Sequence, residues 1–277
     1  MFWFLGQATV IQAIQREEEF FAAVNCIDVG RVKMLLSEAA AKDKQTGLQS
    51  YTRKLLSLPN YPYTALGCAV RSYDKGKAES STELVKMLLE AGADANEIKT
   101  VTDYPPLWWA VFVRILSVVK LLLQFGANIN YHYCSISKIV YTPLRLAIRT
   151  LDVEMAKLLI SWGASLDIAE PVRIAEYPPL AVGETPLQTV QRMVGNCERL
   201  YASVAGSLNE NIVYDELERA NAIVKLIEQE KVERARNRAA LRIFEHLLTT
   251  GQLPTKVPQV FVPEIASFLG VNVKSSP

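Results

Sequence analysis

The chain offers few residues that could perform acid–base, nucleophilic or metal chemistry. It has two histidines, His132 and His246, and four cysteines, none of which has a second cysteine at zinc or redox spacing. His132 stands two residues before Cys134, but two ligands do not make a metal site. The sequence contains no Gly-x-Ser-x-Gly, phosphate-cradling glycine loop or His-Glu-x-x-His motif. We therefore predict that the chain is not an enzyme and uses no metal or cofactor.

Aromatic recognition is the second kind of chemistry that the sequence indicates. Residues 131–141 read Y-H-Y-C-S-I-S-K-I-V-Y, which is more aromatic than a turn requires. Exposed tyrosines supply a large contact area at low entropy cost, so they are enriched at interfaces. We therefore expect Tyr131, His132 and Tyr133 to contact a partner.

Composition limits the kind of partner and the compartment. The chain has 277 residues, half of them hydrophobic, which is enough for one elongated array or two small domains. Its net charge of +1 gives no electrostatic case for binding nucleic acid or an anionic membrane. The N-terminus lacks the basic flank of a signal peptide, and no apolar run is long enough to span a bilayer. These features predict a cytoplasmic protein in a reducing compartment.

The clearest structural unit lies between Tyr141 and Asp167. Thr142 is suited to cap a helix, and Pro143 is suited to its first position. A polar break at residues 149–152 separates this helix from a second apolar helix, and Gly163 is suited to end the second one. The pattern predicts a helix–turn–helix hairpin.

This unit recurs twice upstream, at residues 105–130 and 64–96. The distance from Pro106 to Gly126 is 20 residues, as is that from Pro143 to Gly163, whereas the earliest copy carries about seven extra residues between its helices. The pattern resembles the ankyrin repeat, T-P-L-H-x-A-A followed by V-V-x-L-L-L-x-x-G-A-D-x-N. The resemblance implies an all-α fold, an ankyrin-repeat solenoid of helix–turn–helix units with hairpin loops, plus a helical C-terminal extension.

We expect three regions along the chain. Residues 1–20 form a capping helix, residues 21–200 form the repeat array, and residues 201–277 form a helical C-terminal region with a proline-rich tail. Within the array, residues 20–40 fit a degenerate first repeat, and residues 183–190 open a further one. A polar insertion at residues 195–211 is expected to delay the outer helix of that last repeat.

The resemblance also implies a concave groove, formed by the inner helices and the loop tips. In the family, the residues that face this groove lie just before the Thr-Pro position and just after the inner helix, and Trp108 stands at the family's histidine position. Trp109 is expected in the core. The side chains expected to contact a partner are Tyr63, Arg71, Tyr104, Trp108, Phe112, Arg114, Tyr131, His132, Tyr133, Tyr141 and Arg149.

The function that this resemblance implies is binding of a protein or peptide in the groove, without catalysis. The same fold is compatible with a host cytoplasmic protein or with an effector delivered into a host cell. One alternative is a ubiquitin-ligase adaptor, because residues 252–269 loosely resemble the L-P-x-E-I kernel of ligase-recruiting boxes. Another alternative is an enzyme with its site in residues 200–277.

Overall fold

The computed structural model describes residues 2–47, 50–57, 61, 63–99, 104–134, 139–172, 181–204 and 210–250. Over these residues the fold is all-α, with short β-hairpins in its loops, as the sequence predicts. The chain divides into two compact units, Met1–Ile223 and Val224–Pro277. The elements in chain order are α1 (Phe2–Asn25), α2 (Val29–Thr46), α3 (Ser50–Ser57), α4 (Ala65–Arg71), the 3-10 turn η1 (Lys75–Lys77), α5 (Ala78–Glu90), α6 (Pro106–Phe112), α7 (Leu116–Gln124), β1 (Tyr133–Cys134), β2 (Ile139–Val140), α8 (Pro143–Arg149), α9 (Val153–Ser161), β3 (Glu170–Val172), β4 (Ala181–Glu184), α10 (Pro186–Val204) and α11 (Glu210–Thr250).

The α8–α9 hairpin shows how local sequence sets each helix end. The Thr142 hydroxyl accepts a hydrogen bond from the Arg145 backbone N–H at 3.3 Å, and Pro143 takes the first helical position. The Asp152 carboxylate caps α9 in the same way, accepting from the Met155 N–H at 3.1 Å. Gly163 then adopts a φ of 89°, a left-handed conformation that glycine adopts without steric cost. The predicted start and stop signals are confirmed here.

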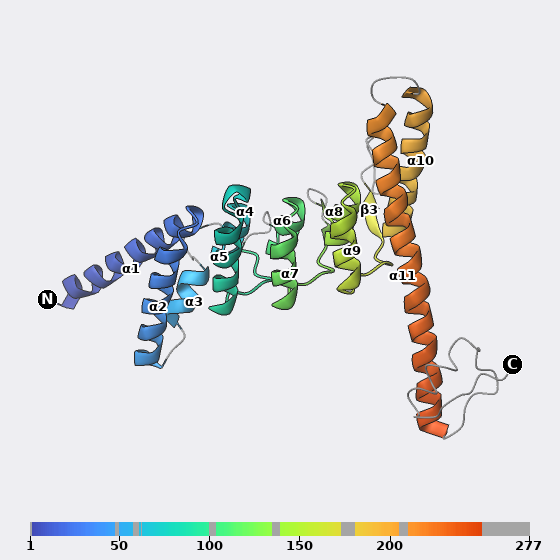
Figure 1. Ribbon diagram of the computed structural model, residues 1–277. Helices are drawn as coiled ribbons and strands as arrows, with labels where there is room; N and C mark the ends of the chain where they lie inside the picture. The colour runs from blue at the N-terminus through green and yellow to red at the C-terminus, as the bar shows by residue number, and fades with distance from the viewer. Residues whose placement is uncertain are drawn as a thin grey trace. The chain divides into compact units, whose positions relative to one another are not determined.

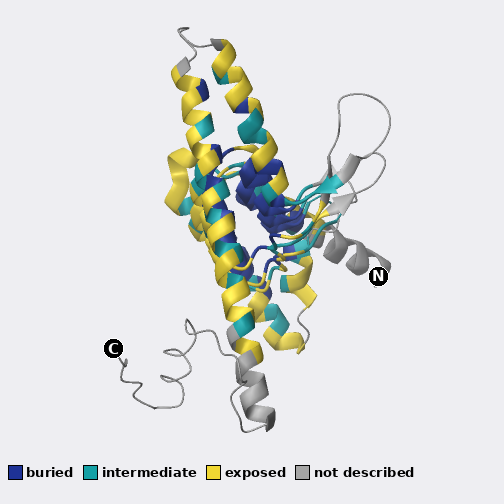
Figure 2. Ribbon diagram, turned by 90° about the vertical axis from the view of Figure 1, so that its right-hand side faces the viewer, coloured by how far each residue is buried: buried dark blue, intermediate teal, exposed yellow. Residues whose placement is uncertain are grey.

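The hairpins stack in two rows in the first unit. Inner helices pack on their neighbours through α1–α4, α4–α6, α6–α8 and α8–α10, and outer helices pack through α2–α5 and α5–α7 (Figure 1). The buried residues, dark blue in Figure 2, are concentrated in the stacked helices of this unit. A repeat buries its apolar face only against its neighbours, so this stacking is what forms the core.

The loops after the outer helices are joined by asparagine side chains. The side-chain oxygen of Asn96, Oδ1, accepts from the Asn128 backbone N–H at 2.7 Å. The side-chain Nδ2 of Asn96 donates to the Gly126 backbone carbonyl at 3.0 Å. One repeat later, Asn130 accepts from the Ser165 N–H at 2.8 Å. Both asparagines end a Gly-Ala-x-x-Asn sequence, so the same side chain links successive loops.

The N-terminal region holds the helices at which the sequence predicts a degenerate first repeat. α1 and α2 form a hairpin that packs on α4 and α5, and α1 is continuous across residue 20. The connection after α2 folds as α3, where the Lys54 ammonium lies 2.9 Å from the buried Glu17 carboxylate. Tyr61 stacks on Phe21 with ring centroids 3.9 Å apart. These contacts tie the long connection to α1.

The last inner helix is longer than α4, α6 and α8. α10 begins at Pro186, where the sequence predicts a further repeat to open, and it packs on α8. It continues to Val204, so residues 195–204 of the predicted polar insertion are helical, and the next helix, α11, begins only at Glu210. Arg199 explains part of this, because its side chain donates to the Gly195 carbonyl at 3.0 Å and to the Asn196 side chain at 2.7 Å along the helix surface.

α11 provides the helical C-terminal region as far as Thr250, and it passes from the first compact unit to the second at residue 223. The predicted pair of Glu230 and Arg234 forms one turn apart on α11, at 2.7 Å. Residues 251–277, which contain the proline-rich tail, lie outside the described residues.

Candidate functional site

Each of the inner helices α4, α6, α8 and α10 has three residues at a spacing of four on one face, and we call these sets the inner-face triads. Residues at i, i+4 and i+8 lie on one face of a helix, so the members of a triad stack along it. The first members directly precede the capping Thr or Pro, and the last members end or closely follow the first two turns of the helix. The triads in chain order are Tyr63, Gly67 and Arg71; Tyr104, Trp108 and Phe112; Tyr141, Arg145 and Arg149; and Glu184, Gln188 and Arg192.

The α6 triad is an aromatic stack. The rings of Tyr104 and Trp108 lie parallel with centroids 3.9 Å apart, and Phe112 continues the stack at 5.2 Å from Trp108. Trp109 meets all three rings edge-on, at 5.4–5.8 Å. Such pairs stabilise beyond their buried area, by about 0.5–1.5 kcal/mol each. Phe112 is 52% exposed, so the stack also presents an aromatic surface.

Arg71 links the α4 triad to this aromatic stack. Its guanidinium lies 3.9 Å from the centroid of Tyr63 in its own triad and 4.6 Å from that of Trp109 on the next inner helix. Cations are attracted to aromatic faces at these distances. The middle member of the α4 triad is Gly67, so no side chain stands between Tyr63 and Arg71 on this face. The prediction of a core position for Trp109 is therefore wrong, because the indole is only half-buried and meets Arg71.

Trp108 lies where the ankyrin pattern has histidine, and the hydrogen bonding of its indole is the point of difference. The Trp108 Nε1 is buried and has no hydrogen-bond partner among the described residues. A buried N–H without a partner costs about 1–3 kcal/mol of desolvation. The ring is retained by its stacking on Tyr104 and Phe112, while its polar atom stabilises nothing.

The α8 triad combines an exposed arginine with a buried one. Arg149 lies over the Tyr141 ring at 4.8 Å, and Arg145 approaches the same ring at 5.4 Å. Arg145 is only 2% exposed, which is unusual for an arginine. It donates from Nη1 to the Glu184 carbonyl at 2.9 Å, and its Nη2 lies 3.5 Å from the Glu184 carboxylate. A buried charge requires such a partner.

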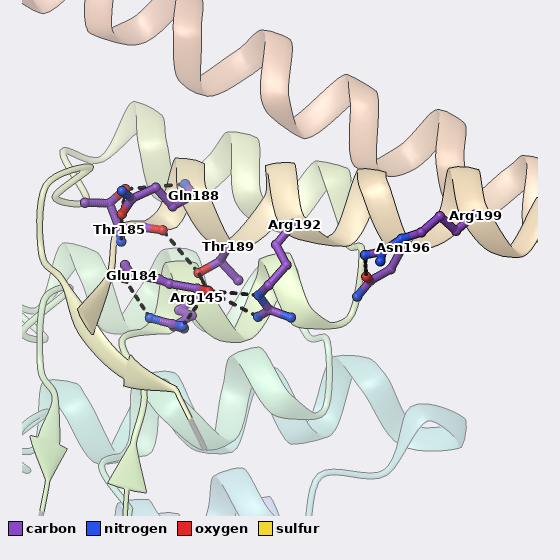
Figure 3. Close-up of polar contacts among 8 residues, drawn as sticks. All are labelled: Arg145, Glu184, Thr185, Gln188, Thr189, Arg192, Asn196 and Arg199. Carbon is purple, nitrogen blue, oxygen red and sulfur yellow. Dashed lines mark hydrogen bonds and ion pairs between the residues drawn. The ribbon is translucent and has the colours of Figure 1, made fainter. Parts of the chain in front are cut away.

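Glu184 joins α8 to α10 through its carboxylate (Figure 3). Arg192 on α10 binds both carboxylate oxygens, at 2.9 and 3.2 Å, and the Thr189 hydroxyl donates to one of them at 3.2 Å. Two guanidinium groups therefore share one carboxylate. The last triad thus replaces the tyrosine–arginine pair of the α4 and α8 triads with a glutamate–arginine pair at the same positions.

The remaining expected site residues lie in turns and loops. Arg114, in the turn after α6, pairs with Asp152 at 2.6 Å and adopts a φ of 63°. Tyr131 and His132 follow α7, where the His132 Nδ1 lies 3.1 Å from the Asn130 carbonyl. Tyr133 lies in β1, paired with Val140, and its side chain is outside the described residues. The structure therefore brings Tyr63, Arg71, Tyr104, Trp108 and Phe112 into one contacting group, and Tyr141 and Arg149 into a second.

The sequence analysis did not assign to the site four residues that contact members of the triads or belong to them: Trp109, Arg145, Glu184 and Arg192. The signal that could have found the last two is the eight-residue spacing, because Tyr63–Arg71, Tyr141–Arg149 and Glu184–Arg192 share it. Arg145 could not be found in this way, because its burial depends on a partner, Glu184, that lies 39 residues later in the chain.

Other chemistry is limited in the described part of the chain. It holds no group of three or more histidine, cysteine or acidic residues that could bind a metal ion. No helix there is both long enough and apolar enough to cross a bilayer. The shifted pKa values lie outside the triads: burial raises the pKa of Glu97 and lowers that of Lys99, whose ammonium donates to the Tyr61 carbonyl at 3.0 Å.

Comparison with known proteins agrees with this architecture. The sequence profile of ankyrin repeats matches residues 77–170 in three copies. A protein of Acanthamoeba polyphaga mimivirus, named as an ankyrin repeat protein, is 35% identical over 63 residues, covering 20% of this chain and 8% of the viral protein. A protein of fowlpox virus (strain NVSL) with the same kind of name is 30% identical over 107 residues, covering 39% of this chain and 22% of its own. The chain therefore contains ankyrin repeats over residues 77–170, and its matches span less than a quarter of these relatives.

Proposed function

We propose that the chain is a recognition module that binds a protein partner on the inner-face triads of α4, α6 and α8, without catalysing a reaction. Ankyrin repeats are protein-interaction modules, which supports the general class. The observation that carries the proposal is the contacting group of Arg71, Trp109, Tyr104, Trp108 and Phe112, in which Arg71 and Phe112 are exposed and the other three are partly buried. Tryptophan, tyrosine and arginine are the residues that contribute most of the binding energy at protein interfaces.

The degree of exposure also supports a binding role. The expected contact residues whose side chains are described are half-buried or exposed, as a preformed binding surface requires. Their contacts with one another hold the rings and guanidinium groups in place before a partner arrives. Less side-chain entropy is then lost on binding, which favours affinity.

The experiment is a selection of displayed peptides on the full chain, followed by binding measurements on matched variants. Phe112 and Phe125 belong to the same repeat and are similarly exposed, at 52% and 43%, but Phe112 is on the inner face and Phe125 follows the outer helix α7. We expect Phe112→Ser to weaken the selected peptides by about tenfold or more and Phe125→Ser to leave them unchanged. Equal effects of the two substitutions would contradict binding on the triads.

The adaptor proposal concerns residues 252–269, which lie outside the described residues. We further propose that the module acts in the cytoplasm, either of its own cell or of a host cell into which it is delivered. The peptide selection tests binding by the module in both cases.

A further inference from the structure

The last members of the inner-face triads form a row with one residue per repeat: Arg71, Phe112, Arg149 and Arg192. Each lies seven residues after the helix-capping position, on inner helices that pack in sequence along the array. All four side chains are exposed. The row therefore presents three guanidinium groups and one aromatic ring, and no acidic residue holds this position in any of the four repeats.

Charge is unevenly distributed around this row. The whole chain has a net charge of +1, with 30 basic and 29 acidic residues, so three arginines in a row are a local concentration. Arg149 lies on the Tyr141 ring and forms no ion pair within the described residues. At the end of the row, Arg192 and the buried Arg145 share the single carboxylate of Glu184. Positive charge on a surface of this kind attracts an acidic partner.

We propose that the partner is an extended acidic segment of a protein, whose carboxylates meet Arg71, Arg149 and Arg192 and whose apolar side chain meets Phe112. This inference rests on the proposed function. Guanidinium groups bind carboxylates through paired, charge-assisted hydrogen bonds, which gives both affinity and register.

The repeat spacing sets the spacing of the partner's side chains. Packed helices lie roughly 8–10 Å apart, and a segment in the extended polyproline II conformation advances about 3.1 Å per residue with three residues per turn, so one repeat corresponds to about three residues and every third side chain faces the row. The complementary segment has an acid, an apolar residue three positions later, and acids after six and nine positions, in one chain direction or the other.

Other occupants fit the row less well. A second copy of this chain would bring arginine rows together, which is unfavourable. The chain's own segment 251–277 has one acidic residue, Glu264, against two lysines, so its charge has the wrong sign. Single-stranded nucleic acid also binds arginine and aromatic side chains, so it is included as an outcome of the test.

The test uses fluorescent peptides with this pattern in both chain directions, the same peptides with glutamine for glutamate, and an oligothymidylate. The protein is the full chain, as wild type, Arg149→Gln or Lys157→Gln. Lys157 is exposed on α9 of the same repeat, so both substitutions remove one positive charge, but only Arg149 is in the row. We expect one glutamate peptide to bind at least about tenfold more tightly than its glutamine version, Arg149→Gln to weaken it several-fold, and Lys157→Gln to leave it unchanged.

Three results would overturn the inference: equal binding of glutamate and glutamine peptides, equal effects of the two substitutions, or stronger Arg149-dependent binding of the oligothymidylate. Failure of this inference can be distinguished from failure of the proposed function. If selected peptides depend on Phe112 but carry no acids, the recognition module stands and the acidic partner is wrong. If Phe112→Ser affects no ligand, both are wrong.

Discussion

The contacts between α4 and α6 and those between α8 and α10 join neighbouring inner helices by different chemistry. Between α4 and α6, Arg71 meets Trp109 beside a stack of rings. Between α8 and α10, the buried Arg145 meets Glu184, which Arg192 also holds. Stacked rings stabilise the fold through their buried apolar area and their relative orientation, and such a group of rings tolerates the loss of one contact. A buried ion pair tolerates no such loss, because the group left behind keeps its desolvation cost.

This comparison shows how an irregular repeat protein can keep one architecture. The ankyrin pattern fixes the helix ends through Thr142, Pro143 and Gly163, and these do not depend on the chemistry of the triads. The triads are then free to be aromatic in one repeat and ionic in another. The aromatic version leaves an exposed surface for a partner, whereas the ionic version uses its buried arginine to hold the next inner helix.

The largest effect is expected for Arg145→Met. The substitution removes the buried partner of Glu184, so we expect the free energy of unfolding to fall by about 2–3 kcal/mol, less than for a fully buried pair because Arg192 remains. Urea unfolding measures this loss. Hydrogen exchange should locate it in α10 and not in α6, because repeats are coupled mainly to their neighbours.

Arg192→Met is the matched control for that experiment. Arg192 binds the same carboxylate but is 45% exposed, so its removal should cost less than about 1 kcal/mol. A similar cost for both arginines would mean that the burial of Arg145 is not what couples α8 to α10.

The sequence predicted the architecture better than the interfaces. Helix ends could be predicted because Thr, Pro, Asp and Gly act locally, through caps and left-handed turns. The position of Trp109 could not, because it depends on a contact with Arg71 that lies 38 residues away in the chain. The extension of α10 to Val204 was missed because polar residues such as Asn196 and Arg199 are compatible with both a loop and an exposed helix face.

A smaller effect is expected when the orphan N–H of the aromatic stack is removed. Trp108→Phe loses ring area, but it also removes a buried hydrogen-bond donor that has no partner among the described residues. We therefore expect the free energy of unfolding to stay within about 1 kcal/mol of the wild-type value. Trp109→Phe loses area facing three rings and Arg71 with no such compensation, and we expect it to cost about 1–2 kcal/mol. Thermal and urea unfolding compare the two. A larger cost for Trp108→Phe would indicate that its Nε1 has a stabilising partner.

The smallest effect is the coupling between Arg71 and Trp109 across the α4–α6 contact. Arg71→Met keeps most of the side-chain stem but removes the cation, so it should cost about 0.5–1 kcal/mol. A double-mutant cycle with Trp109→Leu should recover most of that value as an interaction energy, because the two groups are in contact. Arg149→Met provides the comparison, since Arg149 lies over Tyr141 within its own triad and should show no coupling to Trp109. Equal coupling for the two arginines would mean that Arg71 does not join neighbouring repeats, and the aromatic contact would then hold α4 and α6 together through ring packing alone.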